Sequence, residues 1–376
     1  MPLRLLQTHA CSIKLMKTQQ LTLARHRLRL GIVNVGYWVL LASVGVFWLV
    51  CGDTRNFDVS RLGFVFLAAV AAQSVFDFIG GALLGPEPRP SMRTFLQSWS
   101  RGALVHTLVL TAAGILSFAS FRVTGGFCFS ILLGTAGLAV GRRHLLRAVA
   151  GVSTRETPHA GDTILVARPT PPTFTGGIVG FGPRAQSLLP ERWLESLPES
   201  ELAAETSRRE WQMQNRLPGR ALLLVLGWNL LGGFVGALAL TLPARAPAEA
   251  LLGHACWMTL WGFGGLLILP ALSRYAVFAA DRAAAGSGCD PRDWIERFPS
   301  LVGEDGSSAS AVQTIFYPIP SAARRLRQLE KPLSSFVPGN LARSNLYYSW
   351  ATLTPLGRAV HCNVGCPALW VFPPSA

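Results

Sequence analysis

The chain has 376 residues, of which 50% are hydrophobic and only 14% are charged, and its mean hydropathy is +0.35. A soluble globular protein usually carries about a quarter charged residues, so this composition argues against that class and predicts a membrane protein. The formal net charge of +14 can indicate nucleic acid, but the basic residues gather beside the apolar stretches, and we expect no nucleic-acid partner.

Apolar stretches that are long enough to cross a bilayer as helices divide the chain. We predict about six membrane helices, at residues 30–51, 62–84, 103–121, 125–141, 220–243 and 253–272. The fourth stretch is the shortest, and the third and fourth are also compatible with one tight hairpin. The expected organisation is a basic N-terminal segment (1–29), four membrane helices (30–141), a first cytoplasmic segment (142–219), a membrane hairpin (220–272), a second cytoplasmic segment (273–330) and a tail rich in Pro, Gly and aromatic residues (331–376).

The distribution of Lys and Arg predicts the orientation of these helices. Basic residues cluster before the first predicted span and again after the second and the fourth, whereas the loops after the first, third and fifth are short and poorer in them. This is the positive-inside pattern, so we expect a multi-pass protein of the cell (inner) membrane with both termini and both polar segments in the cytoplasm. The seven cysteines are scattered and odd in number, which argues against a disulfide framework.

The first polar segment begins with features of a small sheet and then turns helical. A short run at Ile164–Ala167 predicts a strand, and a glycine-rich stretch follows at residues 176–182. A helix is expected to start near Pro190, and Pro198 is well placed to open the next one. That second helix contains the sequence ELAAETSRREWQ at residues 201–212.

Four stretches carry a family resemblance through their order and spacing: PTFTGGIVGFGPRAQSLLPERWLESLP, ELAAETSRREWQ, SRYAVFAADR and IFYPIPSAARRLRQL. Together they resemble the HtpX and CAAX prenyl protease family of integral membrane zinc endopeptidases, over roughly residues 160–330. The second stretch stands where the family has its zinc helix, and a membrane hairpin separates it from the third. The resemblance implies a mainly helical membrane bundle that carries a cytoplasmic metallopeptidase-like domain with a small sheet.

The zinc site of this family has a simple chemistry that the present residues lack. A helix carries H-E-x-x-H, whose histidines bind zinc and whose glutamate polarises the metal-bound water; a later helix supplies a third ligand and an acid that orients the site. By the resemblance, the metal ligands fall on Arg208, Gln212 and Val277, the catalytic glutamate falls on Arg209, and only the orienting acid, Asp281, matches. Arginine stays protonated and has no lone pair to donate, and valine has no ligand atom. We therefore predict no catalytic residues and no zinc cofactor.

Without zinc, the carboxylate of Asp281 needs another partner if it is buried. We expect Arg208 or Arg209 to supply it, so that an ion pair between two helices stands where the metal would be. A structure in which Asp281 faces solvent, far from both arginines, would contradict this expectation. Three glutamates of the same helix have spacings typical of a solvated face: Glu201, Glu205 and Glu210.

The leading functional hypothesis is an inactive relative of the membrane zinc proteases. Proteases of this type resemble proteins that pair an extended peptide with a sheet edge. The strand near Ile164 and the glycines Gly176, Gly177 and Gly180 would then form a groove for peptides or membrane-protein segments. Besides the lipid bilayer, such segments or an active paralogous protease that it regulates are the expected partners.

One alternative is an active membrane metalloendopeptidase with a non-standard metal site. His361, Cys362 and Cys366 in the tail are weak candidates for metal ligands, with Cys289 as a source of a fourth. The simpler interpretation is a buried structural tail, in which the aromatic residues pack on the domain or lie at the membrane surface.

The other alternative is a transporter or sensor built on the membrane helices. Asp77 lies within the second predicted span and His106 near the start of the third, and ionisable groups inside a membrane are candidates for function. Asp77 lies near the cytoplasmic end of its span, where we expect its side chain to reach water.

Overall fold

A computed structural model gives the fold of the chain and describes residues 2–52, 57–85, 89–159, 162–240, 246–303, 317–331 and 336–374. Parts of the expected segments lie outside the described residues: the side chains of 2–21 in the basic N-terminal segment, residues 304–316 of the second polar segment, and residues 332–335 of the tail.

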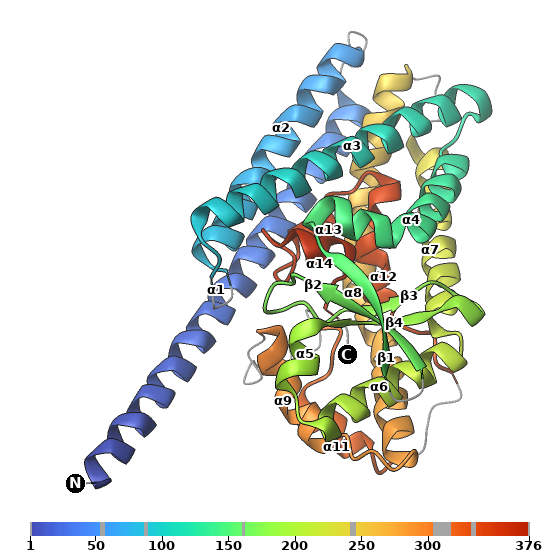
Figure 1. Cartoon of the computed structure of the whole chain (residues 1–376). Coiled ribbons are helices and arrows are strands. Elements are labelled where there is room, and N and C mark those ends of the chain that lie inside the picture. Colours follow the sequence, from blue (N-terminus) through green and yellow to red (C-terminus); the bar gives the residue numbers. More distant parts are fainter. Residues whose placement is uncertain are drawn as a thin grey trace.

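Long helices make up most of the molecule. They are α1 (Pro2–Cys51), α2 (Val59–Phe78) with a π-helical extension (Ile79–Leu83), α3 (Met92–Thr124), α4 (Cys128–Ala150), α7 (Leu217–Leu240) and α8 (Pro247–Gly286). They form three hairpins, α1 with α2, α3 with α4 and α7 with α8, and the C-terminal ends of α1, α3 and α7 lie at the same end of the molecule (Figure 1). Within the described residues, five helical stretches are long and apolar enough to cross a membrane: Thr22–Cys51, Val59–Leu83, Met92–Thr124, Leu217–Ala239 and Pro247–Gly286.

The helix expected as the fourth span differs from the other five. Residues 125–141 do lie largely in a helix, α4, but α4 is not among the five candidate spans. Its apolar part covers about 14 residues before Arg142 and Arg143, or about 21 Å, which is shorter than a hydrocarbon layer of about 30 Å. The described chain therefore has five candidate spans, with α4 packed beside α3 and α7.

The outer faces of the long helices carry large apolar side chains that the rest of the described chain leaves exposed. Leu40 on α1 is 64% exposed and Phe64 on α2 is 74% exposed, and α3 and α7 present similar residues. Soluble monomers rarely expose apolar surface over such an extent. The chain is thus an integral membrane protein, and the lipid bilayer covers these faces.

A four-stranded mixed sheet follows α4. Its strands are β1 (Ser153–His159), β2 (Asp162–Arg168), β3 (Gly177–Val179) and β4 (Gln186–Pro190), in the spatial order β1-β2-β4-β3. β2 pairs antiparallel with β1 and parallel with β4, while β3 pairs antiparallel with β4. The inner strands are therefore β2 and β4, and the edges of the sheet are β1 and β3.

The inner strands β2 and β4 are buried on both faces, which explains the uninterrupted apolar run of β2. Ile164 and Val166 pack into the core of the helical domain, and Leu165 and Ala167 pack toward the tail and the membrane helices. The helical domain consists of α5 (Glu191–Ser196), α6 (Glu199–Gln214), α9 (Arg292–Val302) and α11 (Ala322–Gln328), together with the end of α8.

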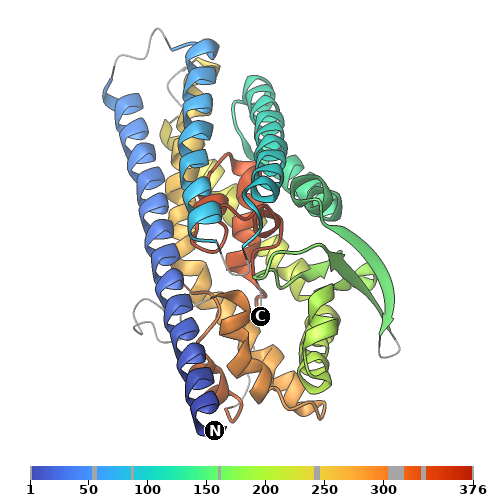
Figure 2. The same cartoon turned by 60° about the vertical axis from the view of Figure 1, so that its left-hand side comes forward.

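The tail packs inside the molecule. It forms α12 (Leu341–Tyr348), a 3-10 turn (Ser349–Thr352), α13 (Leu356–Ala359) and α14 (Pro367–Val371). Figures 1 and 2 both place these red segments between the long helices and above the sheet. Phe336 is exposed, whereas five of its aromatic residues are almost completely buried: Tyr347, Tyr348, Trp350, Trp370 and Phe372. Of the two expected locations, the interior of the molecule is the one observed.

Glycines allow the tail to touch the backbone of α2 and its π-helical extension. A Cβ atom at Gly81 would lie 2.6 Å from the carbonyl oxygen of Gly365, and one at Gly365 would lie 2.3 Å from the carbonyl oxygen of Asp77. Gly365 also has a φ of +70°, which favours glycine. The two segments can therefore approach this closely only because both positions are glycines, which have no side chain.

A buried ion pair completes this contact. Asp77, expected to reach water, is fully buried, and its carboxylate accepts a hydrogen bond from Nη2 of Arg358. The same carboxylate accepts from the backbone N–H of Gly365 at 3.1 Å and from the Gln73 amide at 3.2 Å. Nη1 of Arg358 lies 3.0 Å from Nδ1 of His106. Arg358 of the tail thus connects α2 to α3.

We expect Arg358→Met to lower the free energy of unfolding by about 3–5 kcal/mol, because it leaves the carboxylate of Asp77 buried without its counter-charge. Denaturant unfolding of the purified protein in detergent measures this change. Arg292→Met is the matched control, since Arg292 belongs to an exposed ion pair that contributes about 0–1 kcal/mol. The double variant Asp77→Leu/Arg358→Met should recover part of the loss, and equal stability of Arg358→Met and wild type would contradict the expectation.

Candidate functional site

α6 holds the residues expected at the zinc-helix position, and one face of it is buried. It begins at Glu199 after Pro198, as the sequence suggests, and packs against α8 and the sheet. Glu201 and Glu205 are 4% and 1% exposed. The solvated face that we expected for these glutamates is therefore wrong: Glu205 contacts the buried arginines Arg208 and Arg209, and Glu201 pairs with the half-exposed Arg297 at 3.0 Å.

Arg208 and Asp281 meet across α6 and α8. Nε of Arg208 donates to Oδ1 of Asp281 at 2.7 Å, and its Nη1 donates to the carboxylate of Glu205 one turn earlier. Asp281 also accepts two hydrogen bonds from Arg325 of α11, at 2.8 Å from Nε and 2.7 Å from Nη2. One carboxylate thus joins three helices, and all four of these side chains are buried.

Arg209 points to the sheet and not to Asp281. Its Nε donates to Glu205 at 2.6 Å, its Nη1 to the carbonyl oxygens of Leu188 at 2.6 Å and Gly177 at 3.2 Å, and its Nη2 to that of Thr175 at 2.7 Å. The guanidinium therefore attaches α6 to β4 and to the edge strand β3. In the family that the sequence resembles, this position holds the catalytic glutamate.

The network keeps its charges despite its burial. Burial lowers the pKa of Arg208, but the carboxylates of Asp281 and Glu205 outweigh burial, so the net pKa lies above the ordinary arginine value. Burial lowers the pKa of Arg209, and Glu205 offsets part of that effect. Since arginine starts from a pKa above 12, both guanidiniums remain protonated.

The site does not fit zinc. The sequence resemblance places the three metal ligands on Arg208, Gln212 and Val277, and of these only Gln212 has a side-chain oxygen atom to offer. The neighbouring carboxylate of Glu205 already accepts from two guanidiniums. Throughout the described ranges, no three His, Cys, Asp or Glu side chains come close enough to hold a metal ion. A cation would also meet the positive charge of the arginines.

A small cavity lies beside this network, at the free edge of the sheet. Its volume is about 80 Å³, and its wall includes Gly176, Gly177 and Ile178 of the β3 segment together with Arg209 and Gln212. Further wall residues come from α7, α8, α12 and the end of the tail: Leu217, Pro218, Ala221, Ala276, Val277, Asn340, Arg343, Ser344, Phe372 and Pro373. The cavity thus lies where the sheet domain meets the membrane helices.

The expected groove is therefore only partly the observed one. Gly176 and Gly177 line the cavity, and Gly180 follows in the turn after β3. Ile164 does not line this cavity; it lines a second cavity of about 130 Å³, together with Gln186 and Ser187 of β4. A Cβ atom at Gly176 would lie 1.8 Å from the carbonyl oxygen of Leu188, so this turn requires glycine.

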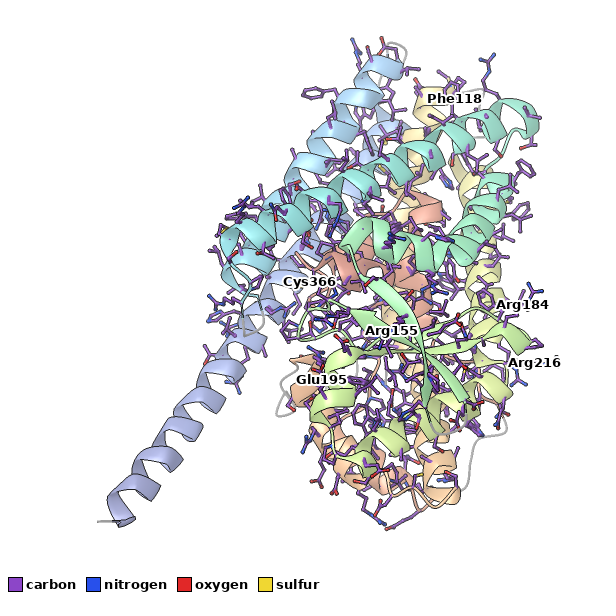
Figure 3. The ribbon with its side chains drawn as sticks, viewed as in Figure 1. Phe118, Arg155, Arg184, Glu195, Arg216 and Cys366 are labelled. Carbon is purple, nitrogen blue, oxygen red and sulfur yellow. The ribbon has the colours of Figure 1, made fainter. Side chains whose placement is uncertain are left out.

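Within the described residues, the alternative metal ligands in the tail belong to no group of three side chains that could hold a metal ion. His361 is buried, and burial together with Arg27 lowers the pKa of its imidazole to about 3. Arg27 donates to the carbonyl oxygen of Cys362 at 3.3 Å and to the thiol of Cys366 at 3.7 Å. Figure 3 shows Cys366 among the membrane helices, whereas Cys289 packs in the core of the helical domain.

Four residues of the site were not identified from the sequence. Glu205 is expected on a solvated helix face. Arg142 belongs to the basic residues after the fourth predicted span, which serve only to predict the orientation of the membrane helices. Arg325 and Arg343 had no assigned role, because the sequence between α8 and the tail gives no spacing rule that places them. The basic run in ARRLRQL was the one signal pointing to Arg325.

Comparisons with known proteins give a structural match. The chain matches no protein-family model and no curated protein. The solved crystal structure of Ste24p from S. mikatae resembles it with a TM-score of 0.59 and 11% sequence identity, over 77% of this chain and 80% of that chain. At this identity the likeness establishes a shared membrane-protein fold, and nothing about activity.

We expect Asp281→Asn to lower the free energy of unfolding by about 3–5 kcal/mol, because Arg208 and Arg325 would then lie buried beside a neutral amide. Denaturant unfolding in detergent measures the loss. Asp290→Asn removes the same charge from an exposed ion pair with Arg292, and its effect should stay within about 1 kcal/mol. If both variants lose the same stability, Asp281 does not hold the helices together.

Proposed function

We propose that this protein is a catalytically inactive relative of the membrane zinc metalloproteases and that it binds extended segments of other membrane proteins without cleaving them. One observation carries the proposal: the arginines at the zinc-helix positions, Arg208 and Arg209, are bound into a closed network with Glu205 and Asp281. The fold shared with Ste24p and the order of the four sequence stretches support the family resemblance.

The loss of catalysis follows from the residues themselves. Peptide hydrolysis by a zinc protease needs a Lewis acid to polarise the carbonyl group and a base to take the proton of water. Arg209 stands at the position of the base and cannot accept a proton, because its guanidinium is already protonated. Arg208 and Val277 cannot bind the metal, so neither requirement is met.

The binding of extended segments rests on the edge of the sheet. β3 pairs with β4 on one side, and its residues Gly177 and Ile178 line the cavity. An extended chain can add to such an edge through main-chain hydrogen bonds. The wall opposite comes from the ends of α7 and α8, so a segment that emerges from the bilayer would meet the cavity directly.

The positive-inside pattern supports a cytoplasmic location for the sheet domain and the termini. In that orientation the protein would meet cytoplasmic segments of neighbouring membrane proteins. An active paralogous protease is one such partner, since a protein that retains the binding site without cleavage competes for the same segments.

Binding without cleavage can be tested with the full chain in lipid nanodiscs. We expect a fluorescent extended hexapeptide to bind and to remain intact, because main-chain pairing with β3 needs no metal. Anisotropy measures binding and mass spectrometry measures cleavage. Elemental analysis should find far less than one zinc per chain.

A matched pair of peptides makes the test specific for the sheet edge. Only alternate N–H groups of a strand point toward its neighbour. N-methylation at one set of alternate residues should abolish binding, and methylation at the other set should leave it. Equal binding of both peptides would contradict pairing with β3, whereas cleavage with stoichiometric zinc that is lost in His361→Ala would establish the active metalloendopeptidase instead.

A further inference from the structure

The hairpin of α3 and α4 carries positive charge and no acidic residue of its own. Between Met92 and Ala150 the sequence has six arginines and neither aspartate nor glutamate. Two of the six are used inside the molecule, since Arg142 donates to the carbonyl oxygen of Val371 and Arg143 donates to the hydroxyl group of Thr154. The other four are exposed: Arg93, Arg101, Arg122 and Arg147. In the part of the chain that the structure describes, no carboxylate pairs with any of these four.

The exposed face of α3 changes from basic to apolar along the helix. Residues three or four positions apart share one face of a helix. The exposed residues Arg93, Gln97 and Arg101 share a face. Leu104 and Leu108 continue it and are 62% and 59% exposed. The apolar face that the bilayer covers therefore ends in two guanidinium groups.

The exposed face of α4 makes the same change in the opposite chain direction. Leu133 and Val140 are exposed, Val140 to 85%, and His144 and Arg147 follow them on the same face. α4 packs beside α3 along the hairpin. Because α3 begins with its arginines and α4 ends with Arg147, both faces place their positive charge at the same end of the hairpin.

One contact confirms that the two basic faces meet. The guanidinium group of Arg101 lies against Gly151, the residue that caps α4, so closely that a Cβ atom at Gly151 would overlap it. The backbone N–H of Gly151 donates to the carbonyl oxygen of Arg147 at 2.8 Å. Arg101 of α3 therefore contacts the turn of α4 that follows Arg147. We call Arg93, Arg101 and Arg147 the basic end of the hairpin.

The length of α4 places this basic end close to the hydrocarbon layer. The apolar part of α4 before Arg142 is about 21 Å long, whereas the hydrocarbon layer is about 30 Å thick. Exposed guanidinium groups at such a depth are costly unless an anion neutralises them. The anionic group that a bilayer itself supplies at this depth is the phosphate of a lipid headgroup.

We propose that the basic end of the hairpin binds the headgroup of an anionic phospholipid, whose acyl chains lie along the exposed apolar faces of α3 and α4. Arg101 and Arg147 provide the charge that recognises the phosphate group, and Leu104 and Val140 contact the acyl chains. A zwitterionic lipid has the same phosphate group, but its own ammonium group cancels the charge, so the site prefers lipid with a net negative charge. This inference does not depend on the peptide groove or on the loss of zinc.

The lipid lies next to the connection between the membrane helices and the sheet. α4 ends at Ala150 and β1 begins at Ser153. Arg143 of α4 also donates to the hydroxyl group of Thr154 in β1 at 2.7 Å. A lipid that holds the end of α4 therefore also helps to orient the sheet domain against the membrane surface.

Native mass spectrometry of the full chain tests the proposal. The chain is placed in nanodiscs with equal amounts of phosphatidylglycerol and phosphatidylcholine, and the lipids that stay bound after its release are identified. We expect the wild-type chain to retain phosphatidylglycerol over phosphatidylcholine by at least about tenfold, because each arginine beside an anionic headgroup contributes about a factor of five.

Variants locate this preference at the basic end of the hairpin. Arg101→Gln and Arg147→Gln should each lower the preference about fivefold, and the double variant should lose most of it. Arg101→Lys should retain most of it, because the charge remains. Arg184→Gln is the matched control, since Arg184 lies on the exposed periphery of the sheet domain (Figure 3). The melting temperature of each variant in discs of phosphatidylcholine alone should equal that of the wild type, which shows that the fold is intact.

Three results would overturn the proposal. The first is equal retention of both lipids by the wild-type chain. The second is a preference that persists in the double variant or falls as much in Arg184→Gln, because the lipid is then attracted by the net charge of the whole protein or binds elsewhere. The third is displacement of the bound lipid by millimolar glycerol phosphate, which has the headgroup charge without acyl chains and would identify a site for a free phosphate group.

Discussion

The hydrogen-bonded contact between Arg208 and Asp281 determines how the sheet domain is assembled. A carboxylate buried at the meeting point of α6, α8 and α11 is tolerated only while guanidiniums surround it. Glu205 then extends the network to Arg209, and Arg209 fixes the edge of the sheet. The arginines that the sequence resemblance places at the zinc helix thus hold the domain together. The cavity beside β3 keeps its shape because the residues behind it are locked together.

Much of the fold was predictable because it depends on local patterns. An apolar run of about 20 residues has few alternatives to a membrane helix, and the run at Ile164–Ala167 is typical of an inner strand. Other features depend on partners that a local pattern does not reveal. Helical periodicity groups Glu201 with Glu205 on one face but does not say that arginines face them. The burial of Asp77 was not predictable from its neighbours in the sequence, because its partner Arg358 lies 281 residues later in the chain.

The candidate site, too, was predictable where it depends on a local pattern and unpredictable where it depends on a distant partner. The resemblance predicts where the degenerate zinc helix lies, since the order of four stretches is a property of the sequence, and this assignment stays a prediction. It did not decide which arginine meets Asp281, because adjacent residues on a helix point about 100° apart and the direction of α8 was unknown. Arg325 could not be foreseen for a physical reason: it reaches Asp281 through the packing of α11 on α8, which no spacing in the sequence encodes.

The ion pair between Arg358 and Asp77 also orders events during biosynthesis. Asp77 and His106 enter the bilayer with the early helices, whereas Arg358 leaves the ribosome after all five candidate spans have been made. Until then the early helices carry a carboxylate that has not met its guanidinium, so the bundle cannot reach its final packing as it is inserted. The final packing of the membrane part therefore waits for the arrival of the tail segment that carries Arg358.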